Sequence, residues 1–215
     1  MALRRMLLLS VPLLAAGCQT TPEAPPQVVI DVTEPVAAWR RVATTEDVAR
    51  IDAIGQRWAN GLAVARRGGF ARRITGEGPL LDPRVSLPQA LLPPGSYRCR
   101  VLRLAGRPGR AALSVFPTHF CQVAHDGDRL SLTKQTGGER PGGYLWPDGD
   151  NRMIFLGAIA QGSERLPPAY RDNRRRDIVG VVERVGPLRY RVTMARADSS
   201  SALDVLELVP APTQN

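Results

Sequence analysis

From Tyr97 onward, short runs of alternating apolar and polar residues follow one another, with turn residues between them. An alternation of period two is typical of a β-strand that buries one face. Asp126-Gly127, Asp148-Gly149 and Gly186-Pro187 are strong turn signals. The pattern predicts eight strands, near residues 97–104, 112–123, 129–136, 143–146, 152–158, 178–185, 188–195 and 203–209, of which the second is irregular around Pro117.

Eight short strands joined by tight turns predict an antiparallel sheet. Closure of such a sheet into a barrel removes its exposed edges. The interior of an eight-stranded barrel is either filled by side chains or holds one small ligand. We therefore expect an α+β, mainly β fold, in which an eight-stranded antiparallel meander forms a barrel or a strongly curved sheet. A two-sheet sandwich is the alternative.

Two of the runs predict what covers the sheet. Tyr190 and Val192 alternate with Arg191 and Thr193, so we expect this strand to have one buried face and one wet face. Residues 153–156 are instead apolar on both faces. A helix or a leucine-bearing arm is therefore expected to cover the outside of the sheet at that strand.

One stretch before the strands, at about residues 45–67, has a helical period. Its apolar residues recur at alternating steps of three and four, at Val48, Ile51, Gly55, Trp58, Leu62 and Ala65. Thr44 with Asp47 resembles a capping box, and Gly68-Gly69 is typical of a helix end. We expect an N-terminal amphipathic helix packed on the sheet, followed by an irregular arm over residues 71–94.

The first eighteen residues have the layout of a secretory signal. Arg4 and Arg5 precede an apolar run at residues 6–15, which is too short to cross a bilayer because about 20 apolar residues are needed. The run leads to Gly17 and Cys18, and this end resembles the lipobox of bacterial lipoprotein precursors. The resemblance implies cleavage between Gly17 and Cys18 and a diacylglyceryl anchor on the Cys18 thiol. An ordinary signal followed by an incidental thiol is the alternative.

These features divide the chain into four parts. We expect a signal peptide at residues 1–17, a lipid anchor with a proline-rich tether at 18–36, one globular domain at 37–210 and a tail at 211–215. By similarity to enterobacterial sorting rules, Gln19 after the lipidated cysteine indicates the outer membrane rather than the inner one. The expected location is the cell envelope, facing the periplasm.

The two remaining cysteines would share an oxidising compartment. We expect a disulfide between Cys99 and Cys121, closing a loop of about 22 residues. Directly opposite positions in a hairpin have a constant sum, which would centre the turn on Arg110. A zinc site made of both thiols, His119 and His125 is the alternative. The usual ligand spacing of zinc sites is missing, so we expect no metal.

The chain has 29 basic and 20 acidic residues and a net charge of +9. In the envelope such a charge favours lipid headgroups, lipopolysaccharide phosphates and cell-wall carboxylates, and nucleic acid is not an expected partner. A solvated loop is the simpler interpretation of the densest arginine run. The candidate anion-binding residues are Arg171, Arg174, Arg175, Arg176, Lys134 and Arg140.

Several segments carry a family likeness, among them GGYLWPD at residues 142–148 and MIFLG at residues 153–157. With residues 95–100, 132–137, 179–184 and 203–210, they resemble an uncharacterised bacterial family, domain of unknown function 4893. The likeness spans about residues 39–210 and implies no activity. A looser similarity to small secreted protease-inhibitor barrels of Gram-negative bacteria, in size, early disulfide and strand number, supports the fold alone.

The sequence lacks a Gly-x-Ser-x-Gly nucleophile elbow and has only two histidines. We therefore expect a non-catalytic envelope lipoprotein, whose membrane-anchored β domain binds an envelope protein or polyanion without a cofactor. One alternative is an enzyme that acts on an envelope polymer and uses His125 or His119 with nearby carboxylates. Another is a small-ligand or protease-inhibitor-like barrel, which requires a cavity.

Overall fold

The computed structural model describes residues 37–105, 111–197 and 202–212. The predicted signal peptide, Cys18, the tether and part of the tail lie outside these residues. The strands are β1 (Gly95–Ala105), β2 (Leu113–Val115), β3 (His119–Asp126), β4 (Arg129–Lys134), β5 (Glu139–Pro147), β6 (Met153–Gln161), β7 (Asp177–Gly186), β8 (Arg189–Arg196) and β9 (Ala202–Pro210).

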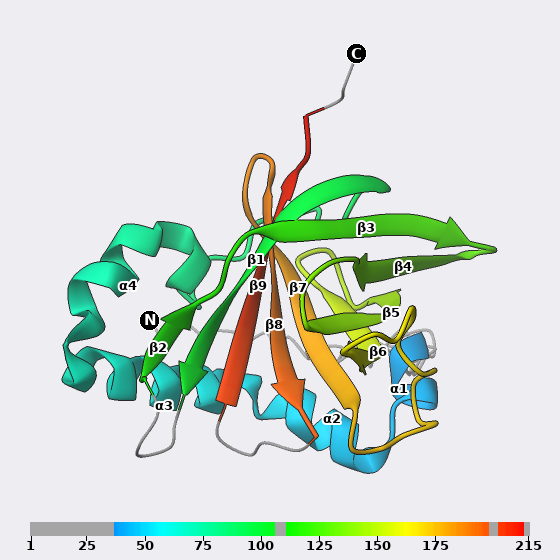
Figure 1. Cartoon of the computed structure of the whole chain (residues 1–215), viewed down its shortest axis with the longest axis horizontal. Coiled ribbons are helices and arrows are strands. Elements are labelled where there is room, and N and C mark those ends of the chain that lie inside the picture. Colours follow the sequence, from blue (N-terminus) through cyan, green and yellow to red (C-terminus); the bar gives the residue numbers. More distant parts are fainter. Residues whose placement is uncertain (1–36, 106–110, 198–201, 213–215) are drawn as a thin grey trace, which may run out of the picture. The chain divides into compact units, whose positions relative to one another are not determined.

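Within the described residues, β1 and β3 to β9 form a closed antiparallel barrel of eight strands (Figure 1). Each strand pairs with the next, and β9 returns to pair with β1 from Tyr97↔Pro210 to Ala105↔Ala202. The predicted mainly β fold and its eight-stranded barrel are confirmed. The sandwich alternative is wrong, because the pairing of β9 with β1 leaves one continuous sheet.

The second predicted strand divides into two at Pro117. β2 pairs with the end of β1 through Leu102↔Val115, whereas β3 pairs with its beginning through Gly95↔Val123. Proline has no backbone N–H to donate to a ladder, so the chain leaves the sheet there and rejoins it two residues later. β2 is therefore an extra strand beside the barrel.

The Cys99–Cys121 disulfide is confirmed, with Cα atoms 5.9 Å apart. The predicted register is wrong by two residues, because Tyr97 lies opposite Cys121 and Cys99 lies opposite His119. The disulfide therefore crosses the ladder diagonally. Both cysteines belong to the buried core inside the barrel.

The helical segment is more broken than predicted. It contains α1 (Ala38–Val42), α2 (Thr45–Asp52), α3 (Ile54–Ala65), a π-helical turn at Arg66–Phe70, α4 (Ala71–Glu77) and a 3₁₀ turn at Gly78–Leu81. Thr44 caps α2, since its side chain accepts a hydrogen bond from the Asp47 N–H, as the capping box predicts. No helix in the described ranges combines the length and the apolarity needed to cross a membrane.

Two parts of the helix prediction are wrong. The helix expected over 45–67 is interrupted at Ala53, where ψ is −3°. The arm expected to be irregular from residue 71 begins with α4, because Gly69 turns the chain at φ 87° and a helix then restarts. The double glycine is therefore a corner between helices rather than a final stop.

Two apolar clusters lie on the two sides of the sheet. Trp58 and Leu62 of α3 belong to the outer cluster, together with Ile154 and other outward side chains of the barrel. Phe155 belongs to the cluster inside the barrel. The cover predicted for the doubly apolar residues 153–156 is thus confirmed.

The prediction that one face of β8 is exposed to solvent is wrong. Arg191 and Thr193 are fully buried, because the helices and the arm cover this side of the sheet as well. The Arg191 guanidinium donates to Glu183 at 2.8 Å and lies 5.4 Å from the ring centre of Trp58. An arginine on a strand face thus serves as an internal hydrogen-bond donor for the covering layer.

Candidate binding site at the mouth of the barrel

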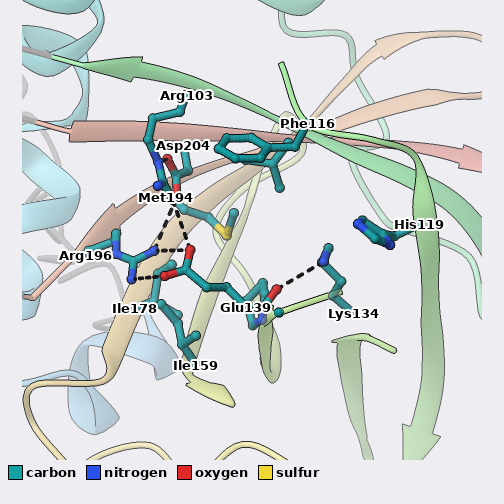
Figure 2. A pocket seen from close by; sticks show the side chains of 13 residues that line it. Arg103, Phe116, His119, Lys134, Glu139, Ile159, Ile178, Met194, Arg196 and Asp204 are labelled. Carbon is teal, nitrogen blue, oxygen red and sulfur yellow. Dashed lines mark hydrogen bonds and ion pairs between the residues drawn. The ribbon is translucent and has the colours of Figure 1, made fainter. Parts of the chain in front are cut away.

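A cavity of about 380 Å³ opens at one end of the barrel interior (Figure 2). β1 and β8 end here, and β3, β7 and β9 begin here, so each of them contributes the inward side chains nearest to this end of the barrel. The volume is within the usual range for small-molecule pockets, at its lower end.

The floor of the cavity is apolar. Val101, Ile159, Ile178 and Met194 line it and continue the inward rows of β1, β6, β7 and β8. These side chains also belong to the core that fills the rest of the barrel. The cavity is therefore the unfilled end of the barrel interior, where an apolar group would meet apolar walls.

Four charged side chains form a closed ring on one wall, which we call the ion ring: Arg103, Asp204, Arg196 and Glu139 (Figure 2). Arg103 Nε lies 2.6 Å from Asp204 Oδ1, and Arg196 donates to both Glu139 carboxylate oxygens at 2.9 and 3.0 Å. Two further ion pairs close the ring: Arg103 with Glu139 at 3.2 Å, and Arg196 with Asp204 at 3.7 Å.

The ion ring keeps its charges. Burial acts to raise the pKa of Glu139, but the hydrogen bonds from Arg196 and Arg103 outweigh it and hold this pKa below its ordinary value. The hydrogen bonds to Asp204 raise the pKa of Arg103 against the effect of burial. Glu139 is therefore ionised at neutral pH and is unsuited to act as a general acid.

The opposite wall carries Lys134 and His119. Lys134 Nζ donates to the carbonyl oxygens of Thr136 and Glu139 at 2.6 and 3.1 Å, which leaves one ammonium hydrogen outside these bonds. Both side chains lie over Gly137, where an added Cβ would come within 2.6 Å of Lys134 Nζ and 2.9 Å of His119 Nε2. Gly137 thus makes room for the two polar groups at the rim.

The charge of Lys134 also acts on its neighbour. Burial lowers the pKa of His119, and the nearby Lys134 ammonium lowers it further below the ordinary 6.5. Burial likewise lowers the pKa of Lys134, with an added contribution from Arg140. At neutral pH the rim therefore presents a neutral imidazole beside a positive charge.

An aromatic side chain stands at the entrance. Phe116 lines the cavity and is 40% exposed. The centre of its ring lies 5.3 Å from the guanidinium carbon of Arg103. Phe116 follows β2, so the extra strand beside the barrel places it there. The entrance thus offers an aromatic surface next to the ion ring.

Lys134 and Arg140, which were both predicted to bind anions, donate hydrogen bonds to the same turn, residues 136–139. Arg140 donates to the carbonyl oxygens of Gly137 and Gly162 at 2.6 and 3.0 Å, and also to that of Glu164. Lys134 lines the cavity, whereas Arg140 lies in the next outward position after Glu139. Anion binding by Lys134 and by Arg140 stays a prediction.

The predicted basic loop, residues 171–176, is held by acidic side chains. Arg174 pairs with the carboxylates of Glu46 at 3.2 Å and Asp177 at 3.4 Å. Arg176 pairs with Glu164 at 2.6 Å.

The two remaining arginines of this loop differ in their roles. Arg171 has φ 79°, and its backbone N–H donates to Asp177 Oδ1 at 3.0 Å. Arg175 is exposed. None of the four arginines lines the cavity at the barrel mouth, and anion binding by this loop remains a prediction.

The two histidines cannot share one site. His119 begins β3 and His125 lies six residues further along the same strand, which is about 20 Å at roughly 3.3 Å per residue. His125 is exposed at the far end. In the described ranges, no group of three or more His, Cys, Asp or Glu side chains could hold a metal ion.

Sequence reasoning missed the ion ring. Its members continue inward rows that the alternation does indicate: Arg103 follows Tyr97, Cys99 and Val101 at steps of two, and Arg196 follows Met194. The feature that could have indicated the ion ring is a charged residue at the end of a strand whose other inward-facing residues are apolar. Lys134 and His119 were singled out from the sequence, but their common place at the rim was not.

These elements define the class of the protein: a closed eight-stranded antiparallel barrel with helices on its outer face and a cavity at one mouth. The family model described as "Domain of unknown function (DUF4893)" matches residues 39–208, so the chain belongs to this family. The match begins at Trp39, whose indole donates to Asp148 Oδ1 at 2.8 Å, and it ends in β9. No curated protein matches the chain, and no solved structure does.

Proposed function

We propose that this protein is a non-catalytic lipoprotein of the bacterial cell envelope, and that its barrel mouth binds a small envelope component. The ligand would have a compact apolar body and an anionic head. The observation that carries this proposal is the 380 Å³ cavity, with its apolar floor and with Lys134 at its rim.

The chemistry of the walls selects this class of ligand. An apolar body displaces water from a floor made of aliphatic and thioether side chains. Each carboxylate of the ion ring is paired with two arginines, so a ligand gains no free negative charge there. The free ammonium hydrogen of Lys134 favours an acceptor that carries negative charge.

The membrane part of the proposal is supported by the lipobox-like end at Cys18. Lipidation there would place the domain on a tether of about eighteen residues, which at roughly 3.1 Å per residue reaches about 55 Å. A binding domain on such a tether would sample ligands close to the membrane that holds it. Metabolic labelling with palmitate tests this part, and a Cys18→Ala chain that still takes up label would overturn it.

The ligand part is tested with three probes that share one apolar body: decanoate, decanol and decyltrimethylammonium. Each is titrated against the chain loaded with the fluorescent probe anilinonaphthalenesulfonate, and its displacement gives the affinity. We expect decanoate to bind most tightly and the cation most weakly. Lys134→Met should remove the preference for decanoate, about 10-fold or more for a charged hydrogen bond.

A pair of matched variants localises the binding. Val101→Phe fills the floor of the cavity, whereas Val209→Phe adds the same ring on a partly exposed position of β9. We expect the first to weaken decanoate binding at least about 10-fold while the second leaves it unchanged. Equal binding by both variants, with both folded by circular dichroism, would show that the cavity is not the site.

A further inference from the structure

The π-helical turn after α3 and the first turn of α4 together carry four exposed arginines: Arg66, Arg67, Arg72 and Arg73. We name these four residues the basic corner. Figure 1 shows α4 at the left edge of the view, beyond β2. None of the four lines the cavity at the barrel mouth, so the basic corner is separate from the candidate binding site.

The corner is fixed by its backbone and by packing. Gly69 has φ 87°, in the left-handed region that favours glycine, and this lets the chain turn from α3 into α4. Phe70 packs against the outer core, and a Cβ added to Gly68 would lie 3.2 Å from Ala112 Cβ. The arginine side chains are therefore not needed to hold the turn.

The segment of the chain that carries the basic corner has little acidic charge of its own. Residues 53–76 contain five arginines and no Asp or Glu. In the part of the chain that the structure describes, Arg73 alone of the four has a carboxylate partner, Glu77, at a distance of 4.0 Å. The arginines of the 171–176 loop, by contrast, include two that pair with carboxylates at 3.4 Å or less.

We propose that the basic corner binds the phosphate headgroups of an anionic phospholipid surface. Guanidinium groups form charge-assisted hydrogen bonds with phosphate oxygens. The four groups are divided between the end of one helix and the start of the next, which suits a layer of many phosphates better than one enclosed ion. The inference rests on the proposed function, because tethering through Cys18 would keep a lipid surface within reach.

The expected effect follows from the charge. One arginine near an anionic membrane contributes about a fivefold gain in binding. Loss of all four should therefore weaken binding on the order of several hundred-fold if every one reaches the surface. Added salt should weaken it as well, because exposed charges are screened.

The test uses the expected mature chain, residues 18–215, with Cys18→Ala, so that neither the signal peptide nor a lipid anchor masks the contact. Binding is measured by sedimentation with phosphatidylcholine vesicles, with and without phosphatidylglycerol. The corner variant changes all four arginines to Gln, and the matched control changes Arg171, Arg174, Arg175 and Arg176 to Gln. A second corner variant, with Lys at all four positions, keeps the charge and checks that a loss is not due to misfolding.

We expect the unsubstituted chain, the Lys variant and the loop control to bind phosphatidylglycerol vesicles, and the Gln corner variant to lose at least about 100-fold. Equal loss in the loop control, or loss in the Lys variant, would overturn the proposal. Competition by inorganic phosphate beyond that of chloride at equal ionic strength would assign the site to a free phosphate and also overturn it. Decanoate binding by the corner variant should be unchanged, which separates a failure here from a failure of the proposed function.

Discussion

Arg191 offers the sharpest test of how the covering layer is held. The side chain is fully buried, and it donates to Glu183 at 2.8 Å. It also donates to the backbone carbonyl oxygens of Pro79, Asp82 and Val85 at 3.1, 2.7 and 2.8 Å. One guanidinium thus joins β8 to four points on β7 and on the segment after α4.

Replacing Arg191 with Met leaves a carboxylate and several carbonyl oxygens without a donor. Removing one partner of a buried ion pair typically costs about 3–5 kcal/mol. We expect the free energy of unfolding to fall by about this amount and the melting temperature to fall by roughly 6–20 °C. Arg191→Lys should lie between, because a lysine keeps the charge but cannot donate in several directions at once.

The assay is denaturant unfolding, with Arg175→Met as the control because Arg175 is exposed. The control should stay within about 0.5 kcal/mol of the unsubstituted chain. Trypsin gives an independent measure: faster cleavage after Arg84, whose side chain is 87% exposed, would report release of the arm. Unfolding of Arg191→Met within about 1 kcal/mol of the unsubstituted chain would refute the reasoning, since it would mean that water replaces the guanidinium.

Three further predictions concern the barrel itself. The pKa of Glu139 is held below its ordinary 4.5 in the folded state, so the ion ring contributes stability at neutral pH that is lost as the pH falls through that lowered pKa. Glu139→Gln should therefore make the melting temperature depend less on pH on the acid side. A Cβ on Gly143 would lie 2.2 Å from a backbone oxygen of β6, so Gly143→Ala should cost at least about 1–3 kcal/mol in urea unfolding, whereas Gly138→Ala enters open space and should cost less than about 1 kcal/mol. Removing the disulfide with Cys99→Ala and Cys121→Ala opens a loop of 22 residues and should cost about 3 kcal/mol by the same measurement, and no loss would show that the disulfide is not a constraint on the unfolded chain.

The strand pattern was predictable because it depends on local alternation. β7 and β8 begin and end within one residue of the predicted runs at 178–185 and 188–195. The doubly apolar residues 153–156 also predicted the outer helical layer correctly. Closure of the barrel could be expected but not decided, because the pairing of β1 with β9 joins residues about a hundred positions apart.

The errors come from tertiary packing that local patterns do not record. Arg191 was expected to be exposed to solvent because the polar residues on its face of β8 alternate with apolar ones. The helices cover that face as well, and Arg191 is buried. The cysteine register was two residues off because the β1–β3 connection contains an additional short strand and Pro117. A constant-sum argument assumes a plain hairpin, which this connection is not.

The candidate site was only partly predictable for a similar reason. Lys134 and His119 were named because of their residue types, but nothing in the sequence places them on the same rim. The basic loop was favoured because three of its arginines are adjacent. Partners far away in sequence, such as Glu46 for Arg174, neutralise part of that charge and cannot be seen from a local run.

The ladder between β1 and β9 also has a kinetic consequence. β9 follows all the other strands in the sequence and pairs with both β1 and β8. β1 emerges well before β9, whether from the ribosome or from an export channel, so the barrel stays open on one side until its last strand is available. Such distant pairing gives a high contact order, and folding is expected to take milliseconds to seconds once β9 is available. Until then, the unpaired edge of β1 is available to chaperones and to other nascent chains.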